Sequence, residues 1–256
     1  MILNKLSFFS TCLARLVEVN ILLPEQTWAE GAVPHLKEFP TLYLLHGYGD
    51  NHTSWQRWTN IEHYAEQHKM IVIMPAGERS WYADHVDGSK YFTFVTEELP
   101  AVCRKMFAGV STKRETTFVA GLSMGGYGAL KIALTYPERY AGVASFSGAV
   151  DVTELASILP LNPTYWNNVF GDAEHLEGTK NDIFFLAAES QKQGKPLPRV
   201  YLWCGTEDRL IGSHQKLTQH LTDLNYPLHS TQSAGNHSWP YWDREVKNAI
   251  PYLLEK

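Results

Sequence analysis

No stretch of the sequence approaches the roughly 20 consecutive apolar residues needed to span a bilayer. The net charge is only −5 and the pI is near 6.1, so there is no electrostatic reason to expect binding to nucleic acid or to an anionic membrane. Cysteine is scarce as well: Cys12, Cys103 and Cys204 form no close pair and leave an odd count. A disulfide framework is therefore not expected, and the composition fits the reducing cytoplasm.

Familiar metal and cofactor motifs are also missing. The histidines and cysteines show no H-E-x-x-H or C-x-x-C spacing, no G-x-G-x-x-G follows a first strand, and there is no Walker-type loop. We therefore expect neither a metal ion nor an organic cofactor. No repeat, low-complexity tract or Pro/Gly/Ser linker divides the chain, so residues 1–256 are expected to form a single domain.

The N-terminal stretch MILNKLSFFSTCLARLVEVNILLP carries Lys5 and an apolar segment, two features that a secretory signal also has. Arg15 and Glu18 interrupt the apolar stretch, and apolar and polar residues alternate over residues 16–21. Alternation with a period of two is typical of a strand. We therefore expect this stretch to belong to the folded domain rather than to a cleaved signal peptide.

Short apolar runs alternate with helix-like stretches along the chain. Runs such as TLYLL and IVIM are apolar on both faces, as in a mostly parallel central sheet with helices on both faces. The expected strands are residues 17–23, 41–45, 71–74, 116–120, 142–147 and 199–204, with a weaker one at 229–233. The expected helices are residues 61–68, 95–106, 124–134, 183–192, 214–224 and 239–254. The pattern predicts an α/β fold with a short insertion near residues 151–195 that forms part of a pocket wall.

The stretch AGLSMGGYGALKIAL, residues 120–134, surrounds Ser123 with glycines, although a glycine in a helix costs about 1 kcal/mol relative to alanine. Ser123 lies between a strand-like and a helix-like run, inside G-x-S-x-G, which is the context of a nucleophile elbow. The turn is so tight that side chains at Gly121 and Gly125 would collide with neighbouring backbone. We therefore predict that Ser123 is a catalytic nucleophile; a glycine-rich turn with a capping serine is the alternative.

A serine hydroxyl needs a general base to become a good nucleophile. In this fold the expected order along the chain is serine, acid, histidine. His237 lies in the loop SAGNHSW, before the final helix, at the edge of the sheet where the other loops gather. His214, His220 and His229 fall in helix-like or strand-like runs and are expected to be packed or solvated. We therefore predict that His237 is the base.

The base in turn needs a carboxylate that orients it. Glu207 and Asp208 lie in the loop after the strand at residues 199–204. Asp151, after another strand end, is a weaker candidate. The residues alone leave the choice between Glu207 and Asp208 open.

Two backbone N–H groups are expected to form an oxyanion hole. Met124 follows the nucleophile and supplies one of them. The second is expected from Tyr48, because the loop LLHGYGD follows an early strand and Gly47 permits a tight turn. Each such donor is typically worth about 10²–10³ in rate. We interpret His46 as a structural partner of this loop.

Five blocks in order along the chain resemble the esterase D-like branch of the α/β-hydrolases, and especially the bacterial tributyrin esterases, which are small cytoplasmic carboxylesterases. The blocks are YLLHGYGDNHTSW, TKRETTFVAGLSMGGYGALKIAL, FSGAVD, CGTEDRL and SAGNHSWPYW. The resemblance covers about residues 15–250. It implies an α/β-hydrolase fold with Ser123, Asp208 and His237 as the triad and Tyr48 and Met124 as oxyanion donors. Asp208 is favoured over Glu207 because it matches the G-x-x-D spacing after this strand in related enzymes.

The resemblance also implies the reaction. It suggests hydrolysis of short-chain acyl esters, with acetyl, phenolic or cinnamoyl esters included. S-formylglutathione hydrolases share the architecture but usually carry Leu-Thr-Cys where this chain has Tyr48, Gly49 and Asp50. A thioesterase of that type is the alternative activity, and a hydrolase-fold binding protein without catalysis is a weaker one.

The sequence thus predicts a cytoplasmic serine carboxylesterase that acts on small-molecule esters and has no nucleic-acid or membrane partner. It leaves the oligomeric state open, a homo-oligomer included. It also leaves open whether Trp81, Tyr82 and Trp239 line the pocket or only pack in the core.

Overall fold

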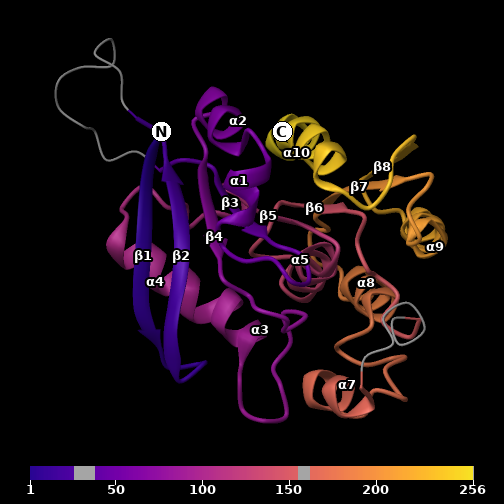
Figure 1. Ribbon diagram of the computed structural model, residues 1–256. Helices are drawn as coiled ribbons and strands as arrows, with labels where there is room; N and C mark the ends of the chain where they lie inside the picture. Colours follow the sequence, from indigo (N-terminus) through magenta and orange to yellow (C-terminus); the bar gives the residue numbers. More distant parts are fainter. Residues whose placement is uncertain (26–37, 155–161, 256) are drawn as a thin grey trace.

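The computed structural model describes residues 1–25, 38–154 and 162–255, built around one eight-stranded sheet with the order β1-β2-β4-β3-β5-β6-β7-β8 (Figure 1). The strands are β1 (Ile2–Ser10), β2 (Arg15–Leu23), β3 (Thr41–Leu45), β4 (Ile71–Pro75), β5 (Thr117–Leu122), β6 (Gly142–Phe146), β7 (Arg199–Gly205) and β8 (Leu228–Ser233). β1 and β2 pair antiparallel, as do β2 and β4. The other neighbouring strands, in the order β4-β3-β5-β6-β7-β8, all pair in parallel. The predicted mostly parallel sheet is confirmed.

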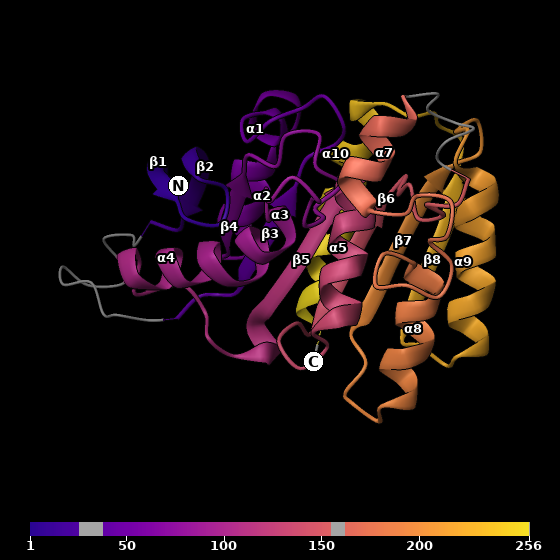
Figure 2. The same ribbon diagram turned by 90° about the horizontal axis from the view of Figure 1, so that it is seen from below.

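Helices cover both faces of the sheet. They are α1 (Ser54–Trp58), α2 (Ile61–Gln67), α3 (Tyr91–Thr93), α4 (Leu99–Met106), α5 (Met124–Thr135), α7 (Pro163–Phe170), α8 (Ile183–Lys192), α9 (Ile211–Asp223) and α10 (Trp239–Leu254). α5 and α10 lie on opposite faces of β5 and β6 (Figure 2). Along β3, Tyr43 and Leu45 pack in one apolar cluster while Leu42 and Leu44 pack in the other. This two-sided burial explains why the run TLYLL has no polar face.

The strand register brings the functional loops to one edge of the sheet. Leu45 of β3 pairs with Gly121 of β5, and Leu122 of β5 pairs with Phe146 of β6. Phe146 in turn pairs with Trp203 of β7. Because the carboxyl ends of these parallel strands are level, the loops that follow them meet at the same edge, where ligands bind in open α/β sheets.

Strand β1 was not predicted. It pairs with β2 along its whole length, from Ile2 opposite Leu23 to Ser10 opposite Arg15, and forms the hairpin at one edge of the sheet in Figure 1. The connecting residues 11–14, TCLA, contain none of the Gly, Asn or Asp that mark hairpin turns. Instead the Glu98 carboxylate holds the turn, because it accepts hydrogen bonds from the Thr11 N–H at 2.7 Å and from the Ser10 hydroxyl.

Within the predicted insertion at residues 151–195, α8 matches the expected helix and α7 is additional. Residues 155–161 of the insertion lie outside the described residues. The Asn162 side chain caps α7 by accepting the Thr164 N–H at 2.8 Å, and Pro163 occupies the first helical position. The short α1 was also not predicted. Among the described helices, none combines the length and the apolar character needed to cross a bilayer.

Candidate active site

Ser123 occupies a strained turn between β5 and α5. Its backbone has φ 52° and ψ −118°, a region that residues other than glycine seldom adopt. The turn is held by the Ser123 N–H, which donates to the Phe146 carbonyl at 2.9 Å, and by the Ser123 carbonyl, which accepts from the Ala149 N–H at 3.1 Å. The turn therefore has the backbone geometry expected of a nucleophile elbow.

The structure brings Ser123, His237 and Asp208 together in one hydrogen-bonded row. The Ser123 Oγ lies 3.0 Å from the His237 Nε2, and the His237 Nδ1 lies 2.8 Å from the Asp208 Oδ2. Ser123 follows β5, His237 follows β8 and Asp208 follows β7. The His237 side chain is 24% exposed, whereas the Asp208 side chain is fully buried, so the row runs from the interior toward the surface.

Asp208 is held as a carboxylate. Burial by itself raises the pKa of this group, but the hydrogen bond and charge of His237, with the Leu210 N–H at 3.0 Å, bring the pKa below its ordinary value. A carboxylate only accepts hydrogen bonds, so the His237 Nδ1 must carry a proton. The neutral imidazole then has its lone pair at Nε2, directed at the Ser123 hydroxyl.

The other acids considered from the sequence have different surroundings. Glu207 is exposed and accepts a hydrogen bond from the Gly235 N–H, which fastens the loop that leads to His237. Asp151 lies 3.6 Å from the Lys216 ammonium. Neither carboxylate is hydrogen-bonded to His237 in the described part of the chain.

The other three histidines that follow Asp208 contact groups outside the Ser123–His237–Asp208 row. His214 is buried on α9, its Nε2 lies 3.3 Å from the Ser230 hydroxyl, and burial lowers its pKa to about 4. His220 lies 2.9 Å from the Phe184 carbonyl, and the ring of His229 stacks on that of Tyr201 at 5.0 Å. The sequence predicted packed or solvated positions for these three histidines, and in the structure His214 is buried whereas His229 is exposed.

The loop after β3, residues 46–50, lies against the elbow. A Cβ on Gly47 would lie 2.5 Å from the Leu122 Cδ1 and 3.6 Å from the Ser123 Cβ. Tyr48 follows Gly47 directly, and Met124 is the first residue of α5, where the N–H has no acceptor within the helix. Both predicted oxyanion donors therefore belong to segments that adjoin Ser123.

His46 has a structural place in this loop. It is 1% exposed, and its two ring nitrogens lie 2.8 Å from the Gly47 carbonyl oxygen and 2.8 Å from the Gly77 nitrogen. Burial lowers the pKa of His46 to about 4, against the opposing effect of the Gly47 carbonyl, so the ring is neutral. The Gly77 N–H therefore donates to the unprotonated Nε2, and His46 joins the loops after β3 and β4.

The loop after β4, residues 77–82, contacts both candidate oxyanion segments. These contacts were not predicted from the sequence. The Trp81 N–H donates to the Met124 Sδ at 3.4 Å, and the Arg79 guanidinium donates to the Tyr48 hydroxyl at 3.3 Å. The Tyr82 hydroxyl donates to the His46 carbonyl at 3.0 Å. Trp81 and Tyr82 are 1% and 0% exposed, so both are packed in the core, whereas Trp239 is half-buried.

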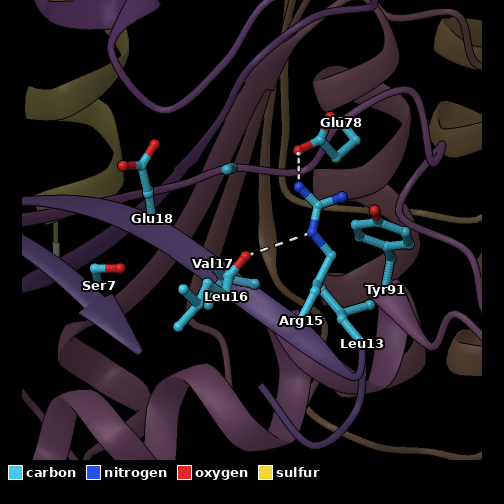
Figure 3. Close-up of a pocket in the computed structure, with 9 residues that line it drawn as sticks. Ser7, Leu13, Arg15, Leu16, Val17, Glu18, Glu78 and Tyr91 are labelled. Atoms are coloured by element: carbon cyan, nitrogen blue, oxygen red, sulfur yellow. Dashed lines mark hydrogen bonds and ion pairs between the residues drawn. The ribbon is translucent and has the colours of Figure 1, made fainter. Parts of the chain in front are cut away.

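A separate cavity of about 260 Å³ lies where the β1–β2 hairpin meets the loop after β4 (Figure 3). In the figure the Arg15 side chain extends between Tyr91 and Glu78, and its Nη2 lies 3.0 Å from the Glu78 Oε1. Both charged side chains are about half exposed, so the pair contributes little to stability. None of Ser123, Asp208 and His237 lines this cavity. Over the residues described, no group of three or more His, Cys, Asp and Glu side chains is arranged to hold a metal ion.

Comparison with known proteins identifies the family. The model of the Esterase family, described as "Putative esterase", matches residues 10–253. The acetyl esterase of Caldicellulosiruptor saccharolyticus is 32% identical over 220 residues, which cover 83% of this chain and 82% of that protein.

Two solved structures from Staphylococcus aureus are also similar. One is the fluorophosphonate-binding serine hydrolase FphF with substrate bound, at a TM-score of 0.92 and 29% identity, covering 100% of this chain and 99% of that one. The other is the S-formylglutathione hydrolase FrmB, at a TM-score of 0.89 and 30% identity, covering 99% of both chains. The chain belongs to the Esterase family of α/β-hydrolases and is a carboxylic ester hydrolase.

Proposed function

We propose that this enzyme hydrolyses short-chain acyl esters through a Ser123–His237–Asp208 triad and an acyl-enzyme intermediate. The observation that carries the proposal is the row of two hydrogen bonds, 3.0 Å and 2.8 Å long, that ends on a serine in a strained elbow. This arrangement supplies a nucleophile, a base and an acid that fixes the tautomer of the base.

The proposed reaction has two halves. In the first, the His237 Nε2 takes the Ser123 proton as the Oγ attacks the ester carbonyl, and the N–H groups of Met124 and Tyr48 stabilise the oxyanion. The tetrahedral intermediate collapses, and the alcohol leaves with the proton from His237. In the second half, His237 takes a proton from water, the hydroxide attacks the acyl-enzyme, and Ser123 leaves with that proton as the carboxylic acid is released.

The proposed substrates are tributyrin-like, acetyl, or phenolic and cinnamoyl esters. The acetyl esterase relative, at 32% identity over most of both chains, supports a small acyl group. The three cysteines are free, which fits our proposal of a cytoplasmic enzyme.

A thioesterase of the S-formylglutathione hydrolase type is the second candidate. It is favoured by the likeness to FrmB, whose description names that activity. The loop residues Tyr48, Gly49 and Asp50 differ from the Leu-Thr-Cys usual in such enzymes, which is why we place it second. A thioester and an oxygen ester would pass through the same acyl-enzyme, so only relative rates separate the two.

The discriminating experiment is a kcat/KM series with p-nitrophenyl acetate, butyrate and octanoate, methyl ferulate and S-formylglutathione, with Ser123→Ala as the control. We expect the acetate or butyrate ester to give the highest kcat/KM and Ser123→Ala to be inactive on every substrate. A value for S-formylglutathione more than about tenfold above the best oxygen ester, a difference of about 1.4 kcal/mol in transition-state stabilisation, would support the second candidate. Full turnover by Ser123→Ala would contradict both.

A further inference from the structure

The loop at residues 77–82 contacts both oxyanion segments. It holds Met124 through the Trp81 N–H and holds the Tyr48 side chain through the Arg79 guanidinium, which also lies over the Tyr48 ring at 5.6 Å. Both contacts are made to side-chain atoms, the Met124 Sδ and the Tyr48 hydroxyl, of the two residues whose N–H groups are proposed to bind the oxyanion.

The conformation of this loop is strained. Glu78, Trp81 and Tyr82 have φ values of 50°, 53° and 47°, in the left-handed region that favours glycine. Such a backbone persists only where surrounding contacts hold it, and it is commonly found at functional sites. Contacts from other parts of the chain are therefore needed to keep residues 77–82 in this conformation.

Tyr165 supplies two of these contacts from a different part of the chain. It lies on α7, in the insertion, and its hydroxyl donates to the Arg79 carbonyl at 2.5 Å and accepts from the Trp81 Nε1 at 3.1 Å. Its ring meets the Tyr48 ring edge-on, with centroids 6.4 Å apart and planes at 86°. One side chain thus contacts the backbone of Arg79, the indole of Trp81 and the ring of Tyr48.

We infer that Tyr165 is a positioning residue for the oxyanion hole, through which the insertion aligns the Tyr48 and Met124 N–H groups. This inference rests on the proposed function, because it requires that these two groups bind the oxyanion. Loss of the Tyr165 hydroxyl leaves the Arg79 carbonyl and the Trp81 indole without this partner, so the strained loop relaxes and the two N–H groups move from their places. Such a loss weakens stabilisation of the transition state more than binding of the ground-state ester.

The test uses Tyr165→Phe, which keeps the ring against Tyr48 and removes only the hydroxyl. We expect kcat for p-nitrophenyl butyrate to fall about tenfold or more, which is less than the 10²–10³ typical for loss of a whole donor, while KM changes less than about threefold. The inhibition constant of a trifluoromethyl ketone, which forms an oxyanion on the serine, should rise by the same factor as kcat/KM falls. Arg79→Gln, on the exposed side of the loop, should change the same quantities in the same direction.

The matched control is Asn168→Ala, also on α7. Its side chain joins the helix to Asp87, accepting from the Asp87 N–H at 3.2 Å and donating to the Asp87 carboxylate at 3.1 Å, with no such bond to residues 77–82. We expect Asn168→Ala to keep kcat and the inhibition constant within about twofold. Unchanged values in Tyr165→Phe, or equal losses in both variants, would overturn the inference. The Ser123→Ala variant distinguishes failure of the proposed function from failure of this inference. Turnover by Ser123→Ala would contradict the proposed function itself. An inactive Ser123→Ala together with unchanged kinetics in Tyr165→Phe would contradict only the role of Tyr165.

Discussion

Gly121 and Gly125 are in backbone contact across the turn that carries Ser123. A Cβ on Gly121 would lie only 2.3 Å from the Gly125 carbonyl oxygen, and a Cβ on Gly125 would lie 2.4 Å from the Leu45 carbonyl oxygen. Real Cβ atoms do not approach backbone oxygens so closely, so any side chain at either position forces the backbone apart. The end of β3, the end of β5 and the start of α5 meet here because two positions in the motif have no side chain.

Gly125→Ala tests this packing. We expect a loss of about 1–3 kcal/mol or more in the free energy of unfolding, because the new methyl group overpacks a backbone contact. We also expect kcat to fall about 10²-fold, because Met124 moves away from Tyr48 and Ser123 moves away from His237. Urea unfolding and p-nitrophenyl butyrate kinetics measure the two effects.

The control for that variant is Gly212→Ala on α9, where a Cβ would meet no atom within 4 Å. This change should leave kcat unaltered and stabilise the fold by up to about 1 kcal/mol, because alanine is the better helix former. Equal stability of the Gly125→Ala and wild-type proteins would show that the elbow is looser than the structure indicates.

Asp208→Asn should lower kcat on the order of 10⁴-fold with little change in KM, because an amide at this position no longer favours the His237 tautomer with its lone pair at Nε2. Glu207→Gln is the matched change on the adjacent residue. It keeps an acceptor for the Gly235 N–H and should retain kcat within about twofold. If the two variants lost activity in the reverse order, Glu207 rather than Asp208 would orient the base.

The buried Lys131 should make the free energy of unfolding depend on pH. It is 3% exposed on α5, its Nζ donates to the Asn181 Oδ1 at 2.7 Å, and burial lowers its pKa from 10.5 to about 7, with Lys180 adding to this effect and Asp84 opposing it. Between about pH 7 and 10.5 the unfolded chain holds a proton that the folded chain has lost. Stability therefore rises with pH across this window, by at most about 1.4 kcal/mol per pH unit.

Lys131→Met removes this titrating group and keeps a side chain of similar length. Urea unfolding of wild type and variant at pH 7, 8, 9 and 10 measures the effect, and comparison of the two proteins cancels the contribution of every other group. We expect the free energy of unfolding of the variant, relative to wild type, to fall as the pH rises. A constant difference would show that Lys131 remains protonated in the folded protein.

The catalytic candidates could be predicted from the sequence because each depends on a local pattern. G-x-S-x-G between a strand and a helix specifies the elbow. Of the histidines that follow the acid in the chain, only His237 lies in a predicted loop rather than in a helix-like or strand-like run. The choice of Asp208 over Glu207 needed the resemblance to a family, since adjacent carboxylates in one loop look alike in sequence. The structure separates them by burial: Asp208 is 2% exposed, and Glu207 lies at the surface.

The contacts that support the site could not be predicted in this way. Tyr165, Arg79 and Tyr48 come from three different segments, and their meeting depends on how α7 packs against Trp81 and against Tyr127 of α5. In the sequence PTYWNNVF the tyrosine is only one of two adjacent aromatic residues. The hairpin of β1 and β2 was missed for a related reason: its turn is held by Glu98, about 90 residues away, rather than by local turn residues.

Mapping the site of a fluorophosphonate adduct by mass spectrometry of the digested protein tests the central claim most directly. The hydroxyl of Ser123 is activated by His237 in this account, so the adduct should be found on the peptide that contains Ser123, and it should be absent from Ser123→Ala. An adduct on a different serine in the wild-type protein, with ester turnover lost in step with that labelling, would contradict the account.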